Sequence, residues 1–344
     1  LNAMDARERG ATVLTRTGVV SARREGDGWV ATLRDERGGA ERTVRAKAVV
    51  NAAGPWVSAT LGGTLGVNSR AAVRLIKGSH IVVKRLFDGD QAYILQQPDK
   101  RIIFAIPYER DFTLIGTTDV PYEGEPGPVT ISESETDYLC GCINRSFDTT
   151  LTPADVVWSY SGVRPLYDDA AENASAVTRD YVLDVEDQGG TAAVLSVFGG
   201  KITTYRRLAE HALEKLKPYF PHLKKAWTGD AVLPGGAMKD ADFDRFLAEL
   251  RAEKPFLPEE TARRLARAYG TRARDIVGTA RSMADLGEAF DGGLTAAEVD
   301  YLRTEEWAVT ADDILWRRSK LGLRTGAESA ARLAAYLDRR AEAA

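Results

Sequence analysis

The stretch FGGKITTYRRLAE, residues 198–210, places a glycine pair, a lysine and two threonines where an apolar strand gives way to a helix. The first turn of a helix presents unpaired backbone N–H groups and a partial positive charge, so it can hold a negative or electron-rich group. A nucleotide phosphate loop requires Gly-x4-Gly-Lys-Ser/Thr. Here residue 195 is leucine and Lys201 is followed by isoleucine, so that loop is excluded. Two readings stay open: an electron-rich ligand, or a turn before a surface helix with Thr203 and Thr204 as local caps.

Two arginines lie within or beside apolar strand runs. Arg164 stands in SGVRPLYDD and Arg179 in TRDY. Arginine is rarely buried without an anionic partner. The guanidinium group grips a phosphate or carboxylate bidentately, so a substrate anion is one candidate partner. The structural alternative is an ion pair with a neighbouring carboxylate, for which the candidates are Asp168, Asp169, Asp180 and Asp184.

Two further groups of polar residues occur beside apolar runs: a histidine, and a Thr-Thr-Asp sequence. His80 occurs in KGSHIVV, and Thr117, Thr118 and Asp119 occur in LIGTTD. Histidine titrates near neutrality, which suits a catalytic base, although a lone histidine is usually structural. The Thr-Thr-Asp group either serves the same site or simply ends a strand.

The segment VVNAAGPWVSATL, residues 49–61, reads as an apolar strand, a turn of small residues and a helix. Small side chains let the backbone approach a ligand closely, and Pro55 suits the first helical turn. By itself this is an ordinary strand-turn-helix.

The elements that must position these residues follow from pattern. Short β-rich runs with glycine turns occupy residues 11–53 and 74–120, which predicts antiparallel meanders. Ser132 and Glu135 form a capping box that opens a helix reaching to about Phe147. Further strands lead to residue 198, and apolar residues spaced three or four apart predict helices beyond a Gly/Pro/Asp-rich linker at 228–242.

Composition bounds the function classes. The 344 residues are 44% hydrophobic and 28% charged with a net charge of −4, which gives no basic footprint for nucleic acid. No apolar run approaches the ~20 residues of a membrane span. Cys140 and Cys142 are expected on different faces of a helix, so a disulfide is not expected and a reducing cytoplasm fits. With only three histidines, we predict no metal site.

Taken in order, these segments resemble the FAD-dependent, quinone-linked glycerol-3-phosphate dehydrogenases of the D-amino-acid-oxidase-like flavoprotein superfamily. VVNAAGPW resembles the superfamily's segment that returns to the flavin. Five segments resemble the narrower family: RLIKGSHIVV, IPYERDFTLIGTTD, SGVRPLYDD, TRDY and SVFGGKITTYRRLAEHALEKL. Three more resemble its C-terminal domain: LPGG, DLGE and DDILWRRSKLGL. The likeness covers essentially the whole chain, and the ordered set is far more specific than any single motif.

The resemblance implies a mixed α+β and α/β fold. We expect a partial, Rossmann-like FAD-binding domain with an inserted antiparallel-sheet substrate domain, followed by an all-α C-terminal domain. The expected boundaries are 1–70 for the partial FAD-binding domain, 71–195 for the substrate domain, 196–227 for the return to the FAD-binding domain, 228–240 for a linker and 241–344 for the helical domain.

One part of the family pattern is missing. The family opens with a βαβ unit whose Gly-x-Gly-x-x-Gly cradles the FAD pyrophosphate, and it carries an early substrate-binding arginine. Neither is found in this sequence, which begins at Leu1. We therefore expect a piece of a longer polypeptide, which is either inactive alone or completed by a separate upstream segment.

The resemblance also implies roles for the candidate residues. Arg179 would bind the substrate phosphate, and Arg164 would hold the substrate oxygen near the reacting carbon and stabilise alkoxide charge. Arginine is too basic to accept a proton, so His80 is the preferred base. Lys201 is assigned to both substrate and reduced flavin. The expected cofactor contacts are Val19 at the adenine, and Ala53, Gly54, Trp56, Gly199, Gly200, Lys201, Ile202 and Thr203 at the flavin.

The implied activity is oxidation of sn-glycerol 3-phosphate to dihydroxyacetone phosphate, with hydride transfer from C2 to FAD and electrons passed on to quinone. The implied location is cytoplasmic and peripheral at the inner face of the membrane. Residues 314–324, with Trp316 among basic side chains, offer a membrane contact or simply a solvated helix face, and self-association stays open. The alternatives are an oxidase that uses O₂ on glycerol 3-phosphate or on an amine or amino acid, and a non-catalytic truncated module.

Overall fold

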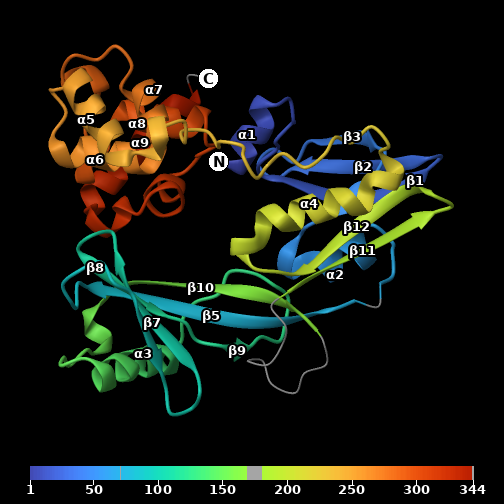
Figure 1. Cartoon of the computed structure of the whole chain (residues 1–344), viewed down its shortest axis with the longest axis horizontal. Helices are drawn as coiled ribbons and strands as arrows, with labels where there is room; N and C mark the ends of the chain where they lie inside the picture. Colours follow the sequence, from blue (N-terminus) through green and yellow to red (C-terminus); the bar gives the residue numbers. More distant parts are fainter. Residues whose placement is uncertain (70, 169–179, 343–344) are drawn as a thin grey trace. The chain divides into compact units, whose positions relative to one another are not determined.

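A computed structural model describes residues 1–69, 71–168 and 180–342 of the chain (Figure 1). The chain divides into two compact units. One, the sheet unit, is Arg16–Gly229; the other, the helical unit, combines Leu1–Thr15 with Asp230–Ala344. The division at 229/230 falls in the segment expected to be a linker. Residues 1–15 lie with the helical unit, whereas we expected them in the first cofactor-binding segment.

The first sheet of the sheet unit is an antiparallel meander in the order β1-β2-β3. Its strands are β1 (Thr17–Glu25), β2 (Gly28–Asp35) and β3 (Glu41–Ala46). Gly26 turns the first hairpin with φ of +65°, a conformation that glycine adopts without strain. The register shifts between Val19 and Ser21, so β1 carries a bulge there.

The second sheet supplies the candidate site and runs β10-β5-β8-β7-β6, antiparallel throughout, with β9 added beside β5. Helix α3 packs on one face of this sheet, where Leu139 meets the inward side chains of β5 and β7, including Ile81 and Ile103. The capping box that opens α3 is confirmed. The meander predicted here holds for β6, β7 and β8 only, because β5 pairs with β8 and not with β6, the next strand along the chain. The elements are β5 (Val73–Lys84), β6 (Tyr93–Gln96), β7 (Ile102–Tyr108), β8 (Phe112–Gly116), β9 (Val120–Pro121), α3 (Glu133–Ser146) and β10 (Val156–Tyr167).

The third sheet has the order β11-β12-β4 and joins segments far apart in sequence. We expected residues 181–195 within the inserted sheet, but β11 (Tyr181–Gln188) and β12 (Thr191–Gly199) pair with each other, and β12 runs parallel to β4 (Val49–Asn51). The physical reason is burial: β12 is apolar and inaccessible on both faces, which suits an inner strand. One of its faces packs with Trp29 and Val57, and the other lies under α4 (Figure 1).

The strands β4 and β12 each lead into a helical segment. After β4 come η1 (Gly54–Trp56), α2 (Val57–Ala59) and η2 (Thr60–Thr64). After β12 come η4 (Ile202–Thr204), α4 (Tyr205–Leu216) and η5 (Lys217–Tyr219). Both predicted strand-turn-helix units are therefore present.

The helical unit is built around a core that includes Leu250, Leu265, Val299 and Leu333, and Met4 of α1 joins that core. Burial of Met4 explains why residues 1–15 belong to this unit. None of the described helices is long and apolar enough to cross a membrane. The α-helices are α1 (Asn2–Glu8), α5 (Phe243–Glu253), α6 (Glu259–Tyr269), α7 (Ala273–Val277), α8 (Ala296–Thr304) and α9 (Ala327–Glu342).

Residues 314–324, for which a solvated helix face was one of the two interpretations, fall in two shorter pieces, η10 (Asp313–Arg318) and η11 (Leu321–Arg324). Gly322 lies against the Trp316 ring so closely that a Cβ there would collide with it. The basic side chains of this segment are engaged within the unit: Arg317 lies 3.4 Å from the Asp313 carboxylate, and Arg318 donates to the Glu306 carbonyl.

Candidate functional site

The ends of β4 and β12 form a candidate ligand-binding edge. The two strands pair in parallel, with Asn51 opposite Ser196, so their carboxyl ends and the turns that follow lie at the same edge of the sheet. In α/β sheets, ligands bind outside the carboxyl ends of parallel strands. This pairing brings the predicted flavin contacts at 53–56 and 199–203 to one edge, although they are about 145 residues apart in sequence.

Glycine conformation shapes both turns. Gly54 has φ of +57° and Gly199 has φ of +72°, a region that side chains with a Cβ rarely adopt. Gly199 is also tightly packed: a Cβ there would lie 2.9 Å from the carbonyl oxygen of Asp180 and 3.1 Å from the Tyr167 nitrogen. The turn after β12 is therefore held against the end of β10, the strand that carries Arg164.

Two large apolar side chains stand exposed at this edge. Trp56 is 48% exposed and Ile202 is 88% exposed. The Trp56 indole donates a 3.1 Å hydrogen bond to the Pro126 carbonyl, which fixes one edge of the ring. Lys201 and Thr203 are exposed as well. The Thr204 hydroxyl donates to the Lys201 carbonyl at 3.0 Å, and neither η4 nor α4 has a side-chain cap hydrogen bond, so the expected capping by threonine is not found there.

Val19 lies in a different sheet from the other predicted cofactor residues. It is 49% exposed in β1, beside the bulge. Its role at the adenine stays a prediction.

The face of β5 and β10 opposite α3 carries His80 and Arg164. Alternate residues of a strand point to opposite faces. The register pairs His80 with Tyr160, Gly78 with Gly162 and Ile76 with Arg164, so these residues share one face. Ser79 and Ile81 point to the other face, toward α3. The structure thus brings together the two residues predicted to act at the reacting carbon.

The His80 ring is held between two neighbouring strands. It stacks on Tyr160 at a centroid distance of 4.8 Å with 9° between the ring planes. On the other side it lies over Gly116, where a Cβ would collide with the imidazole. Its Nδ1 is buried and has no hydrogen-bond partner among the described residues. Burial, together with the nearby Arg164 cation, lowers the pKa of His80 to about 4, so the ring is neutral at pH 7.

Arg164 reaches across β5 to the segment that follows β8. Its Nη2 lies 2.7 Å from the Asp119 carboxylate and donates at 2.7 Å to the Thr118 carbonyl. The side chain crosses over Gly78, where a Cβ would collide with the guanidinium. Among the described residues, both of its polar contacts use Nη2, which leaves Nη1 and Nε for the oxygens of a ligand.

Among the described residues, the carboxylate paired with Arg164 is Asp119, which is not one of the four candidates expected for the two arginines. Asp168 pairs with Arg74 at 3.0 Å, and Asp184 accepts from Ser69 at 2.7 Å. Asp119 takes the role because β9 and β10 flank β5 on its two sides, which places residue 119 opposite Gly78 and within reach of the guanidinium. Arg179 and Asp169 lie outside the described residues.

The sequence reading missed four features of this face: Asp119 as the partner, Tyr160 as the stacking surface, and the bare glycines 78 and 116. A partial signal existed, since Gly78 precedes His80 by two residues and Gly116 directly precedes Thr-Thr-Asp. The strand register, which pairs Gly116 with His80 and places Gly78 where the Arg164 side chain crosses β5, could not be predicted from the sequence.

Comparison with known protein families identifies the family of this chain. A model described as "FAD dependent oxidoreductase" matches residues 1–206, more than half of the chain. The chain belongs to the FAD-dependent oxidoreductase family. A second model, described as the C-terminal domain of alpha-glycerophosphate oxidase, matches residues 226–342.

Three similar proteins carry informative names. The chain is 48% identical over 336 residues to the aerobic glycerol-3-phosphate dehydrogenase of Escherichia coli strain K12, covering 98% of this chain and 67% of that protein. It is 50% identical over 337 residues to a glycerol-3-phosphate dehydrogenase of Pseudomonas aeruginosa, covering 98% and 65%. It is also 50% identical over 332 residues to the D-erythritol 1-phosphate dehydrogenase of Brucella abortus, covering 96% and 66%. The chain thus spans about two thirds of the length of these relatives.

A solved structure shows the same fold. The glycerol-3-phosphate dehydrogenase of Bacillus halodurans, complexed with FAD, superposes with a TM-score of 0.77 at 26% identity, over 98% of this chain and 70% of that one. The expected combination of a flavin-binding fold with sheets and a helical C-terminal domain is confirmed.

For an FAD-dependent oxidoreductase, the residues at the β4 and β12 edge fit the flavin ring. Exposed Trp56 and Ile202 offer apolar surface, and the glycine turns at 54 and 199–200 offer backbone without a Cβ in the way. The orphaned Nδ1 of His80 lies on the face that Arg164 shares. The flavin and substrate roles of these residues stay predictions, and a Gly-x-Gly-x-x-Gly segment is not among the residues of this sequence.

The His80 pKa gives a direct test of this face in the protein without substrate. The pKa lies below its ordinary 6.5, so the neutral ring is favoured in the fold and protonation sets in only as the pH falls toward 4. We expect an NMR titration of the three histidines to show one ring with a midpoint near pH 4, assigned by its loss in His80→Gln. In Arg164→Ala that midpoint should rise, because the nearby cation is gone. An unmoved midpoint would contradict the proximity of the two side chains.

Proposed function

We propose that the full-length protein containing this chain oxidises sn-glycerol 3-phosphate to dihydroxyacetone phosphate with FAD as its cofactor. The observation that carries the proposal is the shared face of β5 and β10. On this face a neutral histidine lies near an arginine whose Nη1 and Nε have no partner among the described residues. Two relatives at 48% and 50% identity are named glycerol-3-phosphate dehydrogenases, which supports this substrate.

Each candidate residue has a separate proposed role in the reaction. FAD, when bound, supplies the hydride acceptor. Arg164 holds the substrate oxygen on C2 through Nη1 and Nε, and stabilises the negative charge that grows on it. His80, neutral at pH 7, accepts the proton of the C2 hydroxyl. Lys201 binds the substrate or the electron-rich edge of the flavin. For Arg179 the proposed role as phosphate ligand rests on its sequence motif.

A second substrate of the same class has comparable support. D-Erythritol 1-phosphate is also a short polyol phosphate, and the relative named for it is 50% identical to this chain. It needs the same arginine for the reacting oxygen and the same base. The two substrates differ in the length of the carbon chain that the site must accept.

Anaerobic flavin bleaching tests the proposal. The full-length gene product, purified with FAD, should lose its absorbance near 450 nm on addition of sn-glycerol 3-phosphate, and unphosphorylated glycerol should leave it unchanged. Faster bleaching by D-erythritol 1-phosphate would move the assignment to that substrate. No bleaching by either phosphate, or bleaching by an amine or amino acid, would overturn it.

We further propose quinone as the electron acceptor and, because quinones are lipid-soluble, contact with the membrane surface without a spanning helix. Turnover with a short-chain quinone should then exceed turnover with O₂. Rapid formation of hydrogen peroxide in air would instead make the protein an oxidase.

A further inference from the structure

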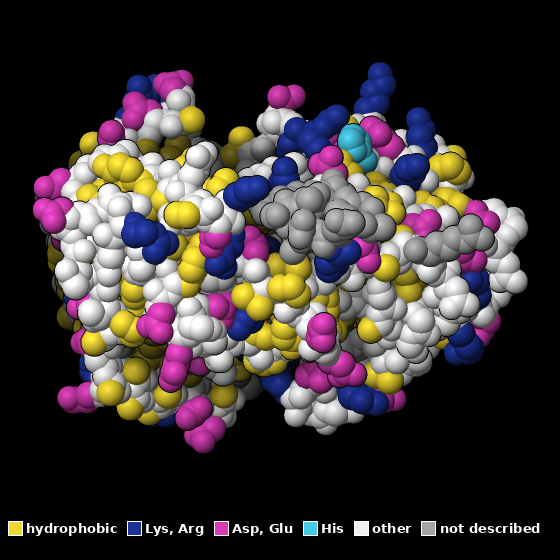
Figure 2. Space-filling model, turned by 90° about the horizontal axis from the view of Figure 1, so that it is seen from below, with side chains coloured by type: hydrophobic (Ala, Val, Ile, Leu, Met, Phe, Trp, Pro, Cys, Tyr) yellow, Lys and Arg dark blue, Asp and Glu magenta, His cyan; other side chains and the backbone are white. Residues whose placement is uncertain are grey.

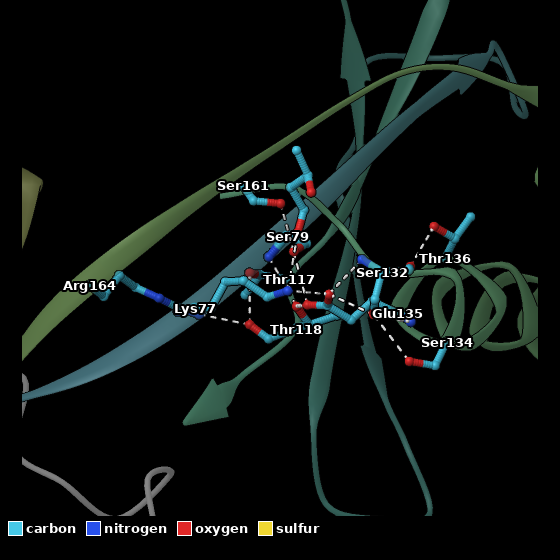
Figure 3. Close-up of polar contacts among 11 residues, drawn as sticks. Lys77, Ser79, Thr117, Thr118, Ser132, Ser134, Glu135, Thr136, Ser161 and Arg164 are labelled. Carbon is cyan, nitrogen blue, oxygen red and sulfur yellow. Dashed lines mark hydrogen bonds and ion pairs between the residues drawn. The ribbon is translucent and has the colours of Figure 1, made fainter. Parts of the chain in front are cut away.

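A buried carboxylate lies directly behind the face that carries Arg164. Glu135, in the first turn of α3, is 6% exposed. One of its oxygens accepts from the Ser132 backbone N–H and hydroxyl, each at 2.9 Å, and lies 2.8 Å from the Lys77 ammonium. The other accepts from the Ser79 hydroxyl at 2.9 Å and the Thr118 hydroxyl at 2.7 Å (Figure 3). A single side chain thus ties together α3, β5 and the segment after β8.

This network goes well beyond what a helix cap needs. The capping box itself involves only Ser132 and Glu135. The oxygen turned toward Thr118 takes no part in the cap and serves only the sheet side. Thr118 is 1% exposed, and its hydroxyl also accepts the Ser79 backbone N–H at 3.0 Å. Both hydrogen-bonding capacities of the Thr118 hydroxyl are therefore used to fix its position.

Thr118 is also the residue that holds Arg164. Its carbonyl accepts from Nη2 at 2.7 Å, and the next residue, Asp119, supplies the carboxylate at 2.7 Å. A chain of direct contacts therefore runs from Glu135 through the Thr118 hydroxyl and backbone to the guanidinium.

We infer that Glu135 and Thr118 are positioning residues that fix the Arg164 guanidinium at the reacting carbon of the substrate. This inference rests on the proposed function, which gives Arg164 its role. Arginine has several rotatable bonds, and its two ties to this unit end on a segment outside the regular strands, at residues 118 and 119. A misplacement of about 1 Å in a catalytic group can lower a rate about 100-fold, so anchoring that segment from behind preserves the geometry.

Thr118→Val tests the inference, because valine keeps the shape but removes the hydroxyl that contacts Glu135 and Ser79. In the FAD-loaded full-length protein we expect kcat to fall about tenfold and KM to change less than about twofold. Thr118→Ser, which restores the hydroxyl, should return kcat to near the wild-type value. Ser134→Ala is the matched control. This exposed hydroxyl lies in the first turn of α3 and, within the part of the chain that the structure describes, its one hydrogen-bond partner is Ser132, so kcat should be unchanged.

Non-additivity shows whether Thr118 acts through Arg164. If it does, adding Thr118→Val to Arg164→Ala should lower kcat no further than Arg164→Ala alone. A full tenfold further loss in the double variant would overturn the positioning role. A folded Thr118→Val protein with wild-type kcat would overturn it as well.

The His80 titration supplies a readout that does not depend on turnover. If Thr118→Val releases Arg164, the His80 midpoint should rise as it does in Arg164→Ala, whereas a merely structural role would leave it in place. Failure of every polyol phosphate to bleach the wild-type flavin would refute the proposed function, and an unmoved His80 midpoint would separately refute this inference. If Thr118→Val is too unstable to purify, Thr118→Cys takes its place, and we expect its kcat to be about threefold lower than that of the wild type. A wild-type kcat in Thr118→Cys would overturn the inference.

Discussion

Replacing Arg164 with alanine is expected to lower kcat about 100- to 1,000-fold, the usual effect of removing one preorganised donor from a developing oxyanion. KM should rise much less, because the proposed contact is to the reacting oxygen and strengthens as charge grows there. The guanidinium is well placed for this: Asp119 and the Thr118 carbonyl fix Nη2, and the bare Gly78 lets the side chain lie flat across β5. Steady-state kinetics of the FAD-loaded full-length protein measures both constants.

Arg101→Ala is the matched control. Arg101 forms an arginine–aspartate pair of the same kind with Asp99, at 2.6 Å in the turn between β6 and β7. Its loss should leave kcat within about twofold, because the pair is partly exposed and such pairs contribute little. A large rise in KM with unchanged kcat in Arg164→Ala would make Arg164 a simple binding residue and would remove it from the chemical step.

Replacing Glu135 with alanine is expected to destabilise the sheet unit by about 3–5 kcal/mol, the range found when one partner of a buried ion pair is removed. The loss leaves the Lys77 ammonium, which is 17% exposed, without its carboxylate, and it leaves the hydroxyls of Ser79 and Thr118 without their acceptor. Urea unfolding at pH 7 measures the free energy of unfolding. Glu133→Ala, an exposed change in the same turn, should cost less than about 0.5 kcal/mol.

The pH dependence of that loss has a definite sign. Burial would raise the pKa of Glu135, but hydrogen bonds from Lys77, Ser132, Thr118 and Ser79 outweigh burial and lower the pKa to about 2 from an ordinary 4.5. A carboxyl with a lowered pKa in the folded state contributes its full stability above its unfolded pKa. The difference between wild type and Glu135→Ala should therefore be constant above about pH 5 and shrink as the pH falls toward 2. A difference that grows on acidification would contradict the ion pair.

Charged side chains of both signs are mixed on the surface of this protein. On the face seen in Figure 2, Lys and Arg side chains lie interspersed with Asp and Glu side chains. Exposed ion pairs occur on the surface, such as the one between Arg34 and Glu41 at 2.6 Å. Such pairs contribute little each, whereas the buried Lys77 and Glu135 pair is costly to break.

Local elements were largely predictable from local chemistry. The Ser132 and Glu135 spacing predicted the start of α3, and the structure has both halves of the box. The Ala-Ala-Gly-Pro and Gly-Gly-Lys segments predicted two strand-turn-helix units, and both are present. Glycine and proline restrict or free the backbone only at neighbouring positions, so their effect can be predicted from local sequence. The helical pattern of residues 314–324 is interrupted between η10 and η11, where Gly322 packs closely against the Trp316 ring.

Long-range pairing was not predictable in the same way. The local sequence of residues 181–195 does not predict whether β12 pairs with β4 or extends the inserted sheet, because an apolar strand would be buried in either sheet. In the structure β12 pairs with β4. The register of β5 against β10 likewise decides that His80 meets Tyr160 and that Arg164 lies over the row of Gly78. A slip of one residue would turn His80 and Arg164 to opposite faces.

The sequence by itself determined the types of group available to the site: two arginines, a histidine, a lysine, and glycine turns where helices begin. Those properties belong to single residues and their nearest neighbours along the chain. Only the tertiary structure decided which carboxylate holds Arg164, why His80 is neutral, and that the capping glutamate of α3 also supports the segment behind the site. These depend on distances between strands far apart in sequence, because pairing and burial set the electrostatics, and neither is encoded in local spacing.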